Sequence, residues 1–279
     1  MADETPTRLE IGSALSKTKH SHQVALALMA YVLQKPKTWL LAHPETPLSK
    51  AQSEELQELL ARLDVGVPLP YLTGRQEFFG LEFEVNPSVL IPRPETEVLV
   101  EAALGWLQAH PQARKGIDVG TGSGCIAVSL ASHCPDLIMV ATDISPQALE
   151  VATRNADRHH VAARVSFCSC DMLPGKVEPV GLLCANLPYI PTAKLSEVES
   201  LPWEPELALD GGKSGLELID SLLARAPDYL TSPGLVLLET EATLGSQTLK
   251  MAKKYFPEAE VSLQQDLSNR DRLIRIEVK

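Results

Sequence analysis

The strongest constraint on the fold is a regular alternation of strand-like and helical segments that starts at Gly116. Short apolar runs typical of buried strands recur along this part of the chain, at residues 116–119, 137–142, 164–169, 180–185, 234–239, 259–264 and 272–278. Helical patterns lie between most of them. This alternation predicts an α/β fold with a parallel, doubly wound sheet, in which ligands bind beyond the carboxyl ends of the strands.

A glycine-rich loop follows the first of these strands. The sequence Ile117-Asp118-Val119-Gly120-Thr121-Gly122-Ser123-Gly124 runs directly into an apolar helical segment, Cys125 to Ala131. Glycines permit a sharp turn and a close approach to a ligand, and the helix N-terminus adds a positive dipole end. The next strand ends at Asp143, 23 positions past Gly120. A carboxylate at that position can accept both hydroxyls of a ribose.

The loop narrows the choice of nucleoside cofactor. A dinucleotide fingerprint needs Gly or Ala where Cys125 stands, and a P-loop needs a Lys after Gly124. S-adenosylmethionine has no pyrophosphate and carries an ammonium, a sulfonium and a ribose. These groups suit one acid beside the loop, Asp118, and another on the next strand, Asp143. The pattern therefore favours S-adenosylmethionine, and a glycine-rich turn without a ligand is the alternative.

A second candidate site follows the apolar run Val180 to Ala185. Asn186-Leu187-Pro188-Tyr189 offers a side-chain amide, an open backbone carbonyl, a rigid proline and an aromatic ring. The Asn oxygen and the Leu187 carbonyl can each accept an N–H, and the ring can stack on a flat group, so a planar –NH2 fits best. The tetrapeptide also fits an ordinary strand-to-turn exit. Because this segment, Asp143, Asp171-Met172 and the glycine loop all follow strand ends, we expect them to converge on one crevice.

The first seventy or so residues follow a helical pattern instead. Apolar residues at Val24, Leu28, Tyr31 and Val32 form one stripe, and Ser49 with Gln52 fits a capping box. A hairpin with a turn at Gly80 is predicted over residues 78–85. We therefore expect a helical domain at 1–74, a β-hairpin linker at 75–90 and the α/β domain at 91–279. The helical domain is either a substrate-binding bundle or a folding cap.

Composition argues against several classes of protein. The net charge of the 279 residues is −11, whereas a broad nucleic-acid footprint needs a basic face. No apolar run reaches the length of a membrane span, and the polar first ten residues do not form a signal peptide. The five cysteines lie mostly in apolar segments, and the seven histidines show no ligand spacing. We expect reduced thiols, no metal, no stable nucleic-acid binding and a cytoplasmic protein.

Several short motifs lie along most of the chain, at Pro70-Tyr71-Leu72-Thr73-Gly74, the hairpin at 78–85, Val89-Leu90-Ile91-Pro92-Arg93-Pro94-Glu95-Thr96-Glu97, the loop at 118–124, Asn186 to Tyr189, Glu204-Pro205, Gly211-Gly212 and Asp271-Arg272. In these motifs the chain resembles the HemK/PrmC-type glutamine methyltransferases that modify peptide chain release factors. The Ile-Pro-Arg-Pro-Glu-Thr-Glu run is specific to that family. The glycine loop is shared by very many methyltransferases, and Asn-Pro-Pro-Tyr is also used by DNA adenine-amino methyltransferases.

The resemblance implies a class I, Rossmann-like S-adenosylmethionine methyltransferase sheet with a small N-terminal helical domain joined by a β-hairpin. It implies methyl transfer from S-adenosyl-L-methionine, with S-adenosyl-L-homocysteine as product. The acceptor would be the side-chain amide nitrogen (N5) of the glutamine in the Gly-Gly-Gln motif of class I release factors. Such methylation would modulate translation termination. The helical domain would help to hold the protein substrate.

The resemblance also assigns roles to individual positions. Cofactor contacts fall on Gly120, Thr121, Gly122, Ser123, Gly124, Asp143, Met172 and Asn186. Catalytic and substrate contacts fall on Asn186, Leu187, Pro188 and Tyr189, with loop packing alone as the alternative role of Tyr189. Asp118 either orients the methionine end or the loop, or is a buried structural carboxylate. Glu95 is either part of a helix cap or a substrate-side residue.

Two positions depart from the family's pattern. Leu187 stands where proline is usual, which predicts a less preorganised loop that still presents its carbonyl. Met172 stands where relatives can carry an aromatic residue, which predicts weaker stacking on adenine. Three other functions remain open at this point. They are a glutamine methyltransferase acting on a large-subunit ribosomal protein, an adenine-amino nucleic-acid methyltransferase, and a non-catalytic cofactor-binding protein.

Overall fold

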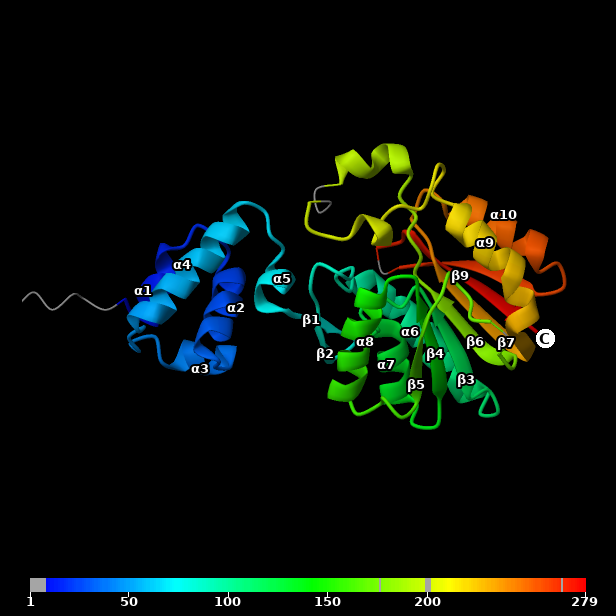
Figure 1. The fold of residues 1–279 in the computed structure, drawn as a ribbon, viewed down its shortest axis with the longest axis horizontal. Helices are drawn as coiled ribbons and strands as arrows, with labels where there is room; N and C mark the ends of the chain where they lie inside the picture. The colour runs from blue at the N-terminus through cyan, green and yellow to red at the C-terminus, as the bar shows by residue number, and fades with distance from the viewer. Residues whose placement is uncertain (1–8, 176, 199–201, 267) are drawn as a thin grey trace, which may run out of the picture. The chain divides into compact units, whose positions relative to one another are not determined.

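The computed structural model describes residues 9–175, 177–198, 202–266 and 268–279 and divides into two units, the first ending at Gly74 and the second beginning at Arg75 (Figure 1). The first unit contains helices α1 (Ile11–Lys17), α2 (His22–Leu33), α3 (Lys37–Ala42), α4 (Lys50–Asp64) and α5 (Leu69–Thr73). Leu28, Met29 and Leu40 are buried in its core. The predicted capping box is confirmed, because Ser49 and Gln52 each bond the other's backbone N–H at the start of α4.

The second unit is built on one sheet of seven strands. The strands are β3 (Lys115–Val119), β4 (Ile138–Asp143), β5 (Val165–Ser169), β6 (Val180–Ala185), β7 (Leu230–Glu239), β8 (Glu260–Gln265) and β9 (Asp271–Val278). Their order is β5-β4-β3-β6-β7-β9-β8. The first five strands in this order each pair in parallel with their neighbours. The predicted α/β class is confirmed.

The prediction that the whole sheet is parallel is wrong for its last two strands. β9 lies between β7 and β8 and pairs antiparallel with both. Only residues 266–270 separate β8 from β9 along the chain. Parallel strands need a crossover of about a dozen residues or more, so a connection this short requires antiparallel pairing.

Helices cover both faces of the sheet, because successive residues of each strand point to opposite sides. On β6, Leu182 and Cys184 pack with α6 (Glu97–Ala109) and α7 (Cys125–His133). Leu183 and Ala185 pack on the other face with α9 (Glu217–Arg225) and α10 (Gly245–Tyr255). Figure 1 shows α9 and α10 on the side of the sheet opposite α7. Helix α8 (Pro146–Arg158) follows β4. Within the described residues, no helix is long and apolar enough to cross a membrane.

A buried amide helps to hold the hairpin at the start of the second unit against the sheet domain. The strands of the hairpin are β1 (Arg75–Phe78) and β2 (Leu81–Glu84), with the turn at Phe79 and Gly80. Asn155 of α8 is fully buried and accepts from the Glu84 N–H at 2.7 Å. Its Nδ2 donates to the carbonyls of Glu84 and Ser123 at 3.0 and 2.9 Å. Asn155 therefore joins the hairpin, α8 and the glycine loop, while the division of residues 1–90 into domain and linker stays a prediction.

We expect Asn155→Ala to lower the free energy of unfolding by about 2–4 kcal/mol, because it leaves the part-buried backbone groups of Glu84 and the buried carbonyl of Ser123 without this partner. Arg154→Ala is the matched control, since it removes only the part-exposed ion pair with Glu84. It should cost less than about 1 kcal/mol. Urea unfolding followed by circular dichroism measures both. Equal losses in the two variants would contradict this role for Asn155.

Candidate functional site

Three strand ends are placed side by side by the register of the sheet. Val119 of β3 pairs with Thr142 of β4 and with Ala185 of β6. The residues that follow these three along the chain, Gly120, Asp143 and Asn186, therefore lie next to one another. A single parallel register thus aligns the glycine loop, an acid and the predicted substrate loop at one edge of the sheet.

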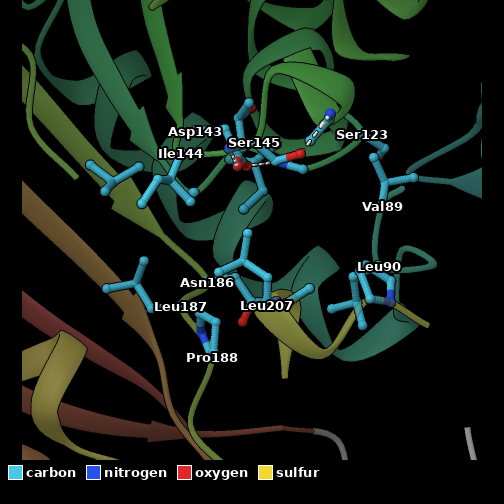
Figure 2. Close-up of a pocket in the computed structure, with 18 of the residues that line it drawn as sticks. Val89, Leu90, Ser123, Asp143, Ile144, Ser145, Asn186, Leu187, Pro188 and Leu207 are labelled. Atoms are coloured by element: carbon cyan, nitrogen blue, oxygen red, sulfur yellow. Dashed lines mark hydrogen bonds between the residues drawn. The ribbon is translucent and has the colours of Figure 1, made fainter. Parts of the chain in front are cut away.

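A cavity of about 200 Å³ opens at this edge. In Figure 2, residues at the end of β4 (Asp143, Ile144), after β6 (Asn186 to Pro188) and in the segment before α6 (Val89, Leu90) surround one open space. The predicted site residues that line it are Gly120, Thr121, Gly122, Ser123, Asp143, Met172, Asn186, Leu187 and Pro188. Four other predicted residues are not among the described residues that line it: Asp118, Gly124, Tyr189 and Glu95.

The glycine loop takes a backbone path that side chains would hinder. Gly120, Gly122 and Gly124 all have positive φ, at 68°, 56° and 82°. L-residues with a Cβ rarely adopt this region, so glycine is needed here. A Cβ on Gly124 would also lie 3.1 Å from that of Ala152 in α8. The loop therefore leads into α7 while leaving its backbone open to the cavity.

Asp118 supports the glycine loop from inside the sheet. It is fully buried, and its Oδ2 accepts from the Thr121 hydroxyl at 2.6 Å and from the Ala127 N–H at 3.2 Å. Among the described residues, its Oδ1 has no hydrogen-bond partner. Burial raises the pKa of Asp118 to about 7, against the hydrogen bond from Thr121. The geometry assigns a structural role to one oxygen and leaves the other with acceptor capacity.

Asp143 closes the same loop from the neighbouring strand. Its Oδ2 accepts from the Gly122 N–H and its Oδ1 from the Ser145 N–H, both at 2.9 Å. Burial raises the pKa of Asp143, and these backbone hydrogen bonds oppose the shift. Each carboxylate oxygen has two lone pairs, so Asp143 retains acceptor capacity towards the cavity. Ser145 is the N-cap of α8, because its hydroxyl accepts from the Ala148 N–H at the start of that helix.

Two apolar side chains lie beside Asp143. Met172 has a left-handed backbone with φ 63°, and its carbonyl accepts a hydrogen bond from the Thr142 hydroxyl. Ile144 also lines the cavity, with 53% of its surface exposed. The sequence reasoning missed Ile144, although an isoleucine directly after the strand-ending acid is a usable signal. The pair presents apolar surface suited to a flat base.

The segment Asn186 to Tyr189 is held by its own side chains. Asn186 Nδ2 donates to the Thr96 hydroxyl oxygen at 3.1 Å. Leu187 is 5% exposed and packs into the sheet core, and its Cδ2 lies 3.1 Å from where a Cβ of Gly120 would stand. Burial raises the pKa of Tyr189 to about 12. Leu187 thus makes a direct contact between the substrate loop and the cofactor loop.

Glycines of a later segment support this loop from behind. A Cβ on Gly211 would lie 2.6 Å from the Tyr189 Cα, and a Cβ on Gly215 would lie 2.2 Å from the Tyr189 carbonyl oxygen. Ile190 exchanges backbone hydrogen bonds with Leu209 and Gly211. Gly215 was not found by sequence reasoning, because its close contact is with a residue distant along the chain. Only glycine allows this approach of two backbones.

An ion pair joins two further segments that border the cavity, one around Arg93 and the other around Glu204. Buried Glu204 accepts from the Ile91 N–H at 3.1 Å and from the Arg93 guanidinium. The segments on either side of this contact, which include Leu90 and Pro205, line the cavity. Both residues belong to the motifs of the resemblance, but their pairing across 111 positions is visible only in the structure. Glu95 is exposed, and Thr96 has no side-chain cap contact at α6, so the expected helix cap is absent.

The site can therefore hold two kinds of group. Asp143, the open glycine backbone and the apolar side chains of Ile144 and Met172 suit a nucleoside. Asn186 and the backbone beside it suit a planar amide. No group of three or more His, Cys, Asp or Glu side chains placed to hold a metal ion occurs in the described parts of the chain.

The raised pKa of Asp118 predicts a specific pH dependence of stability. Between its unfolded value of 3.8 and its folded value of about 7, the folded state keeps a proton that the unfolded state releases. This contribution to stability therefore falls as the pH rises through that window and is level above it. Asp118→Asn lacks the titration but keeps an oxygen for Thr121 and Ala127. From near pH 5 to near pH 8, its unfolding free energy should gain about 2–3 kcal/mol relative to the wild type. Parallel pH profiles in urea unfolding would exclude the effect.

Comparison with known proteins identifies the family. Residues 10–74 match the model of the PrmC N-terminal domain, and residues 96–194 match that of the methyltransferase small domain. The release factor glutamine methyltransferase of Moorella thermoacetica is 41% identical over 89% of this chain and 88% of its own length. The enzyme of the same name from Nitratidesulfovibrio vulgaris is 37% identical over 88% of this chain and 85% of its own length.

A solved structure shares the fold at low sequence identity. The T. thermophilus 16S rRNA N2 G1207 methyltransferase superimposes with a TM-score of 0.54 at 14% identity, over 74% of this chain and 50% of its own. This likeness concerns the fold alone. On the sequence relationships, which span nearly the whole chain, the protein belongs to the family of release factor glutamine methyltransferases.

Proposed function

We propose that this protein transfers the methyl group of S-adenosyl-L-methionine to the side-chain amide nitrogen of the glutamine in the Gly-Gly-Gln motif of class I peptide chain release factors. The observation that carries the proposal is the placement of Asn186 beside the glycine loop and Asp143 on one cavity. The names of the relatives support it. The match of residues 10–74 to the PrmC N-terminal domain supports a role of that unit in holding the protein substrate.

The proposed cofactor site consists of the glycine loop, Asp143, Met172 and the supporting acid Asp118. The residues fit the cofactor because Asp143 retains acceptor capacity for ribose hydroxyls. Asp118, whose Oδ1 is unpaired among the described residues, lies behind a loop that would face the cationic methionine end, and a cation there would favour its ionised form. The T. thermophilus enzyme of the same fold was solved with AdoMet. When bound, the cofactor supplies a methyl group made electrophilic by its sulfonium, and the proposed chemistry involves no metal.

The substrate amide needs orientation more than activation by a base. Its nitrogen lone pair is delocalised into the carbonyl, and the N–H bonds become strongly polarised as the new N–C bond forms. The Asn186 oxygen and the Leu187 carbonyl would each accept one N–H and so stabilise the positive charge that develops on nitrogen. One N–H proton then leaves to solvent, because the nitrogen that has gained a methyl group and still carries both protons is cationic and strongly acidic. Positioning of this kind can lower a barrier by about 7–11 kcal/mol.

The other residues of the proposed site act around this centre. Pro188 lines the cavity and restricts the loop after Leu187. We assign Tyr189 to support of the loop. It is not among the described residues that line the cavity, and its backbone packs on Gly211 and Gly215. Glu95 is exposed beside this region and is proposed to contact the protein substrate outside the cavity.

Asn186→Ala should lower turnover by about 100- to 1,000-fold, because it removes one of the two acceptors that act on the developing charge. The fold should be intact, since the side chain is only part-buried and its hydrogen bond to Thr96 is neutral. Steady-state methyl transfer, with circular dichroism and thermal unfolding as controls, measures this. Turnover near that of the wild type would exclude the mechanism.

The function itself is tested by methyl transfer from labelled S-adenosylmethionine to a purified release factor, beside the variant of that factor with Gln→Ala in its Gly-Gly-Gln motif. We expect label on the first protein only. Label on a large-subunit ribosomal protein or on nucleic acid instead would identify one of the alternative methyltransferases. Cofactor binding without transfer to any of them would indicate a non-catalytic protein.

A further inference from the structure

The proposed reaction requires the Asn186 amide to face the substrate in one of its two orientations. The oxygen and NH2 ends of an asparagine side chain have nearly the same shape, so their hydrogen-bond partners decide which way the group points. If the NH2 end faced the substrate amide, two donors would oppose each other. The partners of Asn186 within the protein therefore determine whether the site can act.

Thr96 is the first of these partners. Its side chain is 2% exposed, at the end of the 3-10 helix η1 (Pro94–Thr96), and its hydroxyl oxygen accepts from Asn186 Nδ2 at 3.1 Å. A hydroxyl has one proton and can also accept. With this geometry alone the hydroxyl could instead donate to a reversed amide. A third group must take the hydroxyl proton to fix the direction of the bond.

Glu239 is placed to take that proton. It is the last residue of β7, whose neighbour Leu238 pairs with Ala185 directly before Asn186, and it is 3% exposed. Hydrogen-bonding interactions with Thr96 and with Asn186 lower the pKa of its carboxyl group, which places both side chains within reach of it. Its Oε2 has no hydrogen-bond partner among the described residues. An ionised carboxylate can only accept, so it directs the Thr96 proton and the Asn186 NH2 towards itself.

We propose that Thr96 and Glu239 are positioning residues, which hold the Asn186 amide with its oxygen towards the substrate nitrogen. The inference rests on the proposed function, because it explains how that function obtains its acceptor. The carboxylate also polarises the chain from Glu239 through Thr96 to Asn186, which strengthens the Asn186 oxygen as an acceptor. Neither residue was assigned this role by the sequence, since the three positions are far apart in it.

The charges around Glu239 decide when this network is intact. Burial raises its pKa to about 7, the hydrogen bond from Thr96 and the charge of Arg272 on β9 lower it, and Glu95 on η1 raises it. Tyr189 after β6 and Cys125 on α7 also face its charge, and the pKa of both is raised mainly by burial. Below this range Glu239 becomes a donor and competes with Asn186 for the Thr96 oxygen. Methyl transfer should therefore decrease as the pH falls through the region near 7.

The experiment compares Thr96→Val, Thr96→Ser and Glu239→Gln in methyl transfer to a release factor. Valine keeps the shape of threonine without the hydroxyl, and serine restores the hydroxyl without the methyl. We expect Thr96→Val to lower kcat about 10- to 100-fold, with the KM for the release factor and the Kd of S-adenosylmethionine within about threefold of wild type. Thr96→Ser should recover most of the loss. Ser129→Ala, which removes another buried hydroxyl away from the cavity, should match the wild type.

Glu239→Gln provides the second arm. It should lower kcat and abolish the decrease near pH 7, because glutamine keeps the shape but does not titrate. A decrease that persists in Glu239→Gln would belong to another group, such as Asp118, and would overturn the role of the Glu239 charge. Wild-type kcat in Thr96→Val, or equal losses in Thr96→Val and Thr96→Ser, would overturn the role of Thr96. If Thr96→Val does not fold, the Glu239→Gln arm decides.

A measurement without substrate separates this inference from the proposed function. The side-chain NH2 signals of Asn186 in a ¹⁵N spectrum, assigned by their loss in Asn186→Ala, report its hydrogen bonds directly. We expect slow exchange with water in the wild type and fast exchange in Thr96→Val. Unchanged exchange would overturn the inference even if release factors are methylated. If the Asn186 NH2 protons exchange slowly in a wild-type protein that methylates no release factor, the proposed function would be overturned, and the hydrogen bonds that hold Asn186 would still stand.

Discussion

The parallel pairing of β3 with both β4 and β6 is the constraint on which the site depends. Because Val119 is level with Thr142 and Ala185, the next residues on the three strands begin the glycine loop, the acid and the substrate loop at the same height. A slip of one residue between β3 and β6 would turn Asn186 to the opposite face and move Leu183 out of its core. The apolar contacts on both faces therefore fix the position of polar groups that contribute little to the core themselves.

Buried acids without complete partners distinguish this edge of the sheet from the rest of the second unit. Asp118 and Glu239 each have one carboxylate oxygen without a hydrogen-bond partner in the described residues, and burial raises the pKa of both to about 7. A folded chain keeps such groups only where the surrounding core is stable enough to offset their desolvation. One stands under the cofactor loop and the other under Asn186, so a carboxyl group that is ionised above about pH 7 lies behind each place where the proposed chemistry develops or holds positive charge.

Much of this arrangement was predictable from the sequence, for reasons that are local. The predicted strand at 180–185 matches β6 because a continuous apolar run marks a strand buried on both faces, and the Ser49 capping box is a contact between near neighbours. The antiparallel β9 was not predicted, since an apolar run carries no information on strand direction. Asn155, Gly215 and Glu239 were missed because each acts on a residue far away in the chain. When the contact partner is far away in the chain, the local sequence does not show whether a polar or glycine residue is exposed or is buried in a tertiary contact.

Leu187 has a consequence that extends beyond the substitution of a proline. Its side chain lies in the core against Gly120, so the loop that would bind the amide and the loop that would bind the nucleoside share one van der Waals contact. Two sites joined in this way are linked thermodynamically: if filling one shifts Gly120, the affinity of the other changes, and the reciprocal change has the same size. The residue that the sequence predicts to loosen the substrate loop thus provides a physical route for cooperative binding of methyl donor and acceptor.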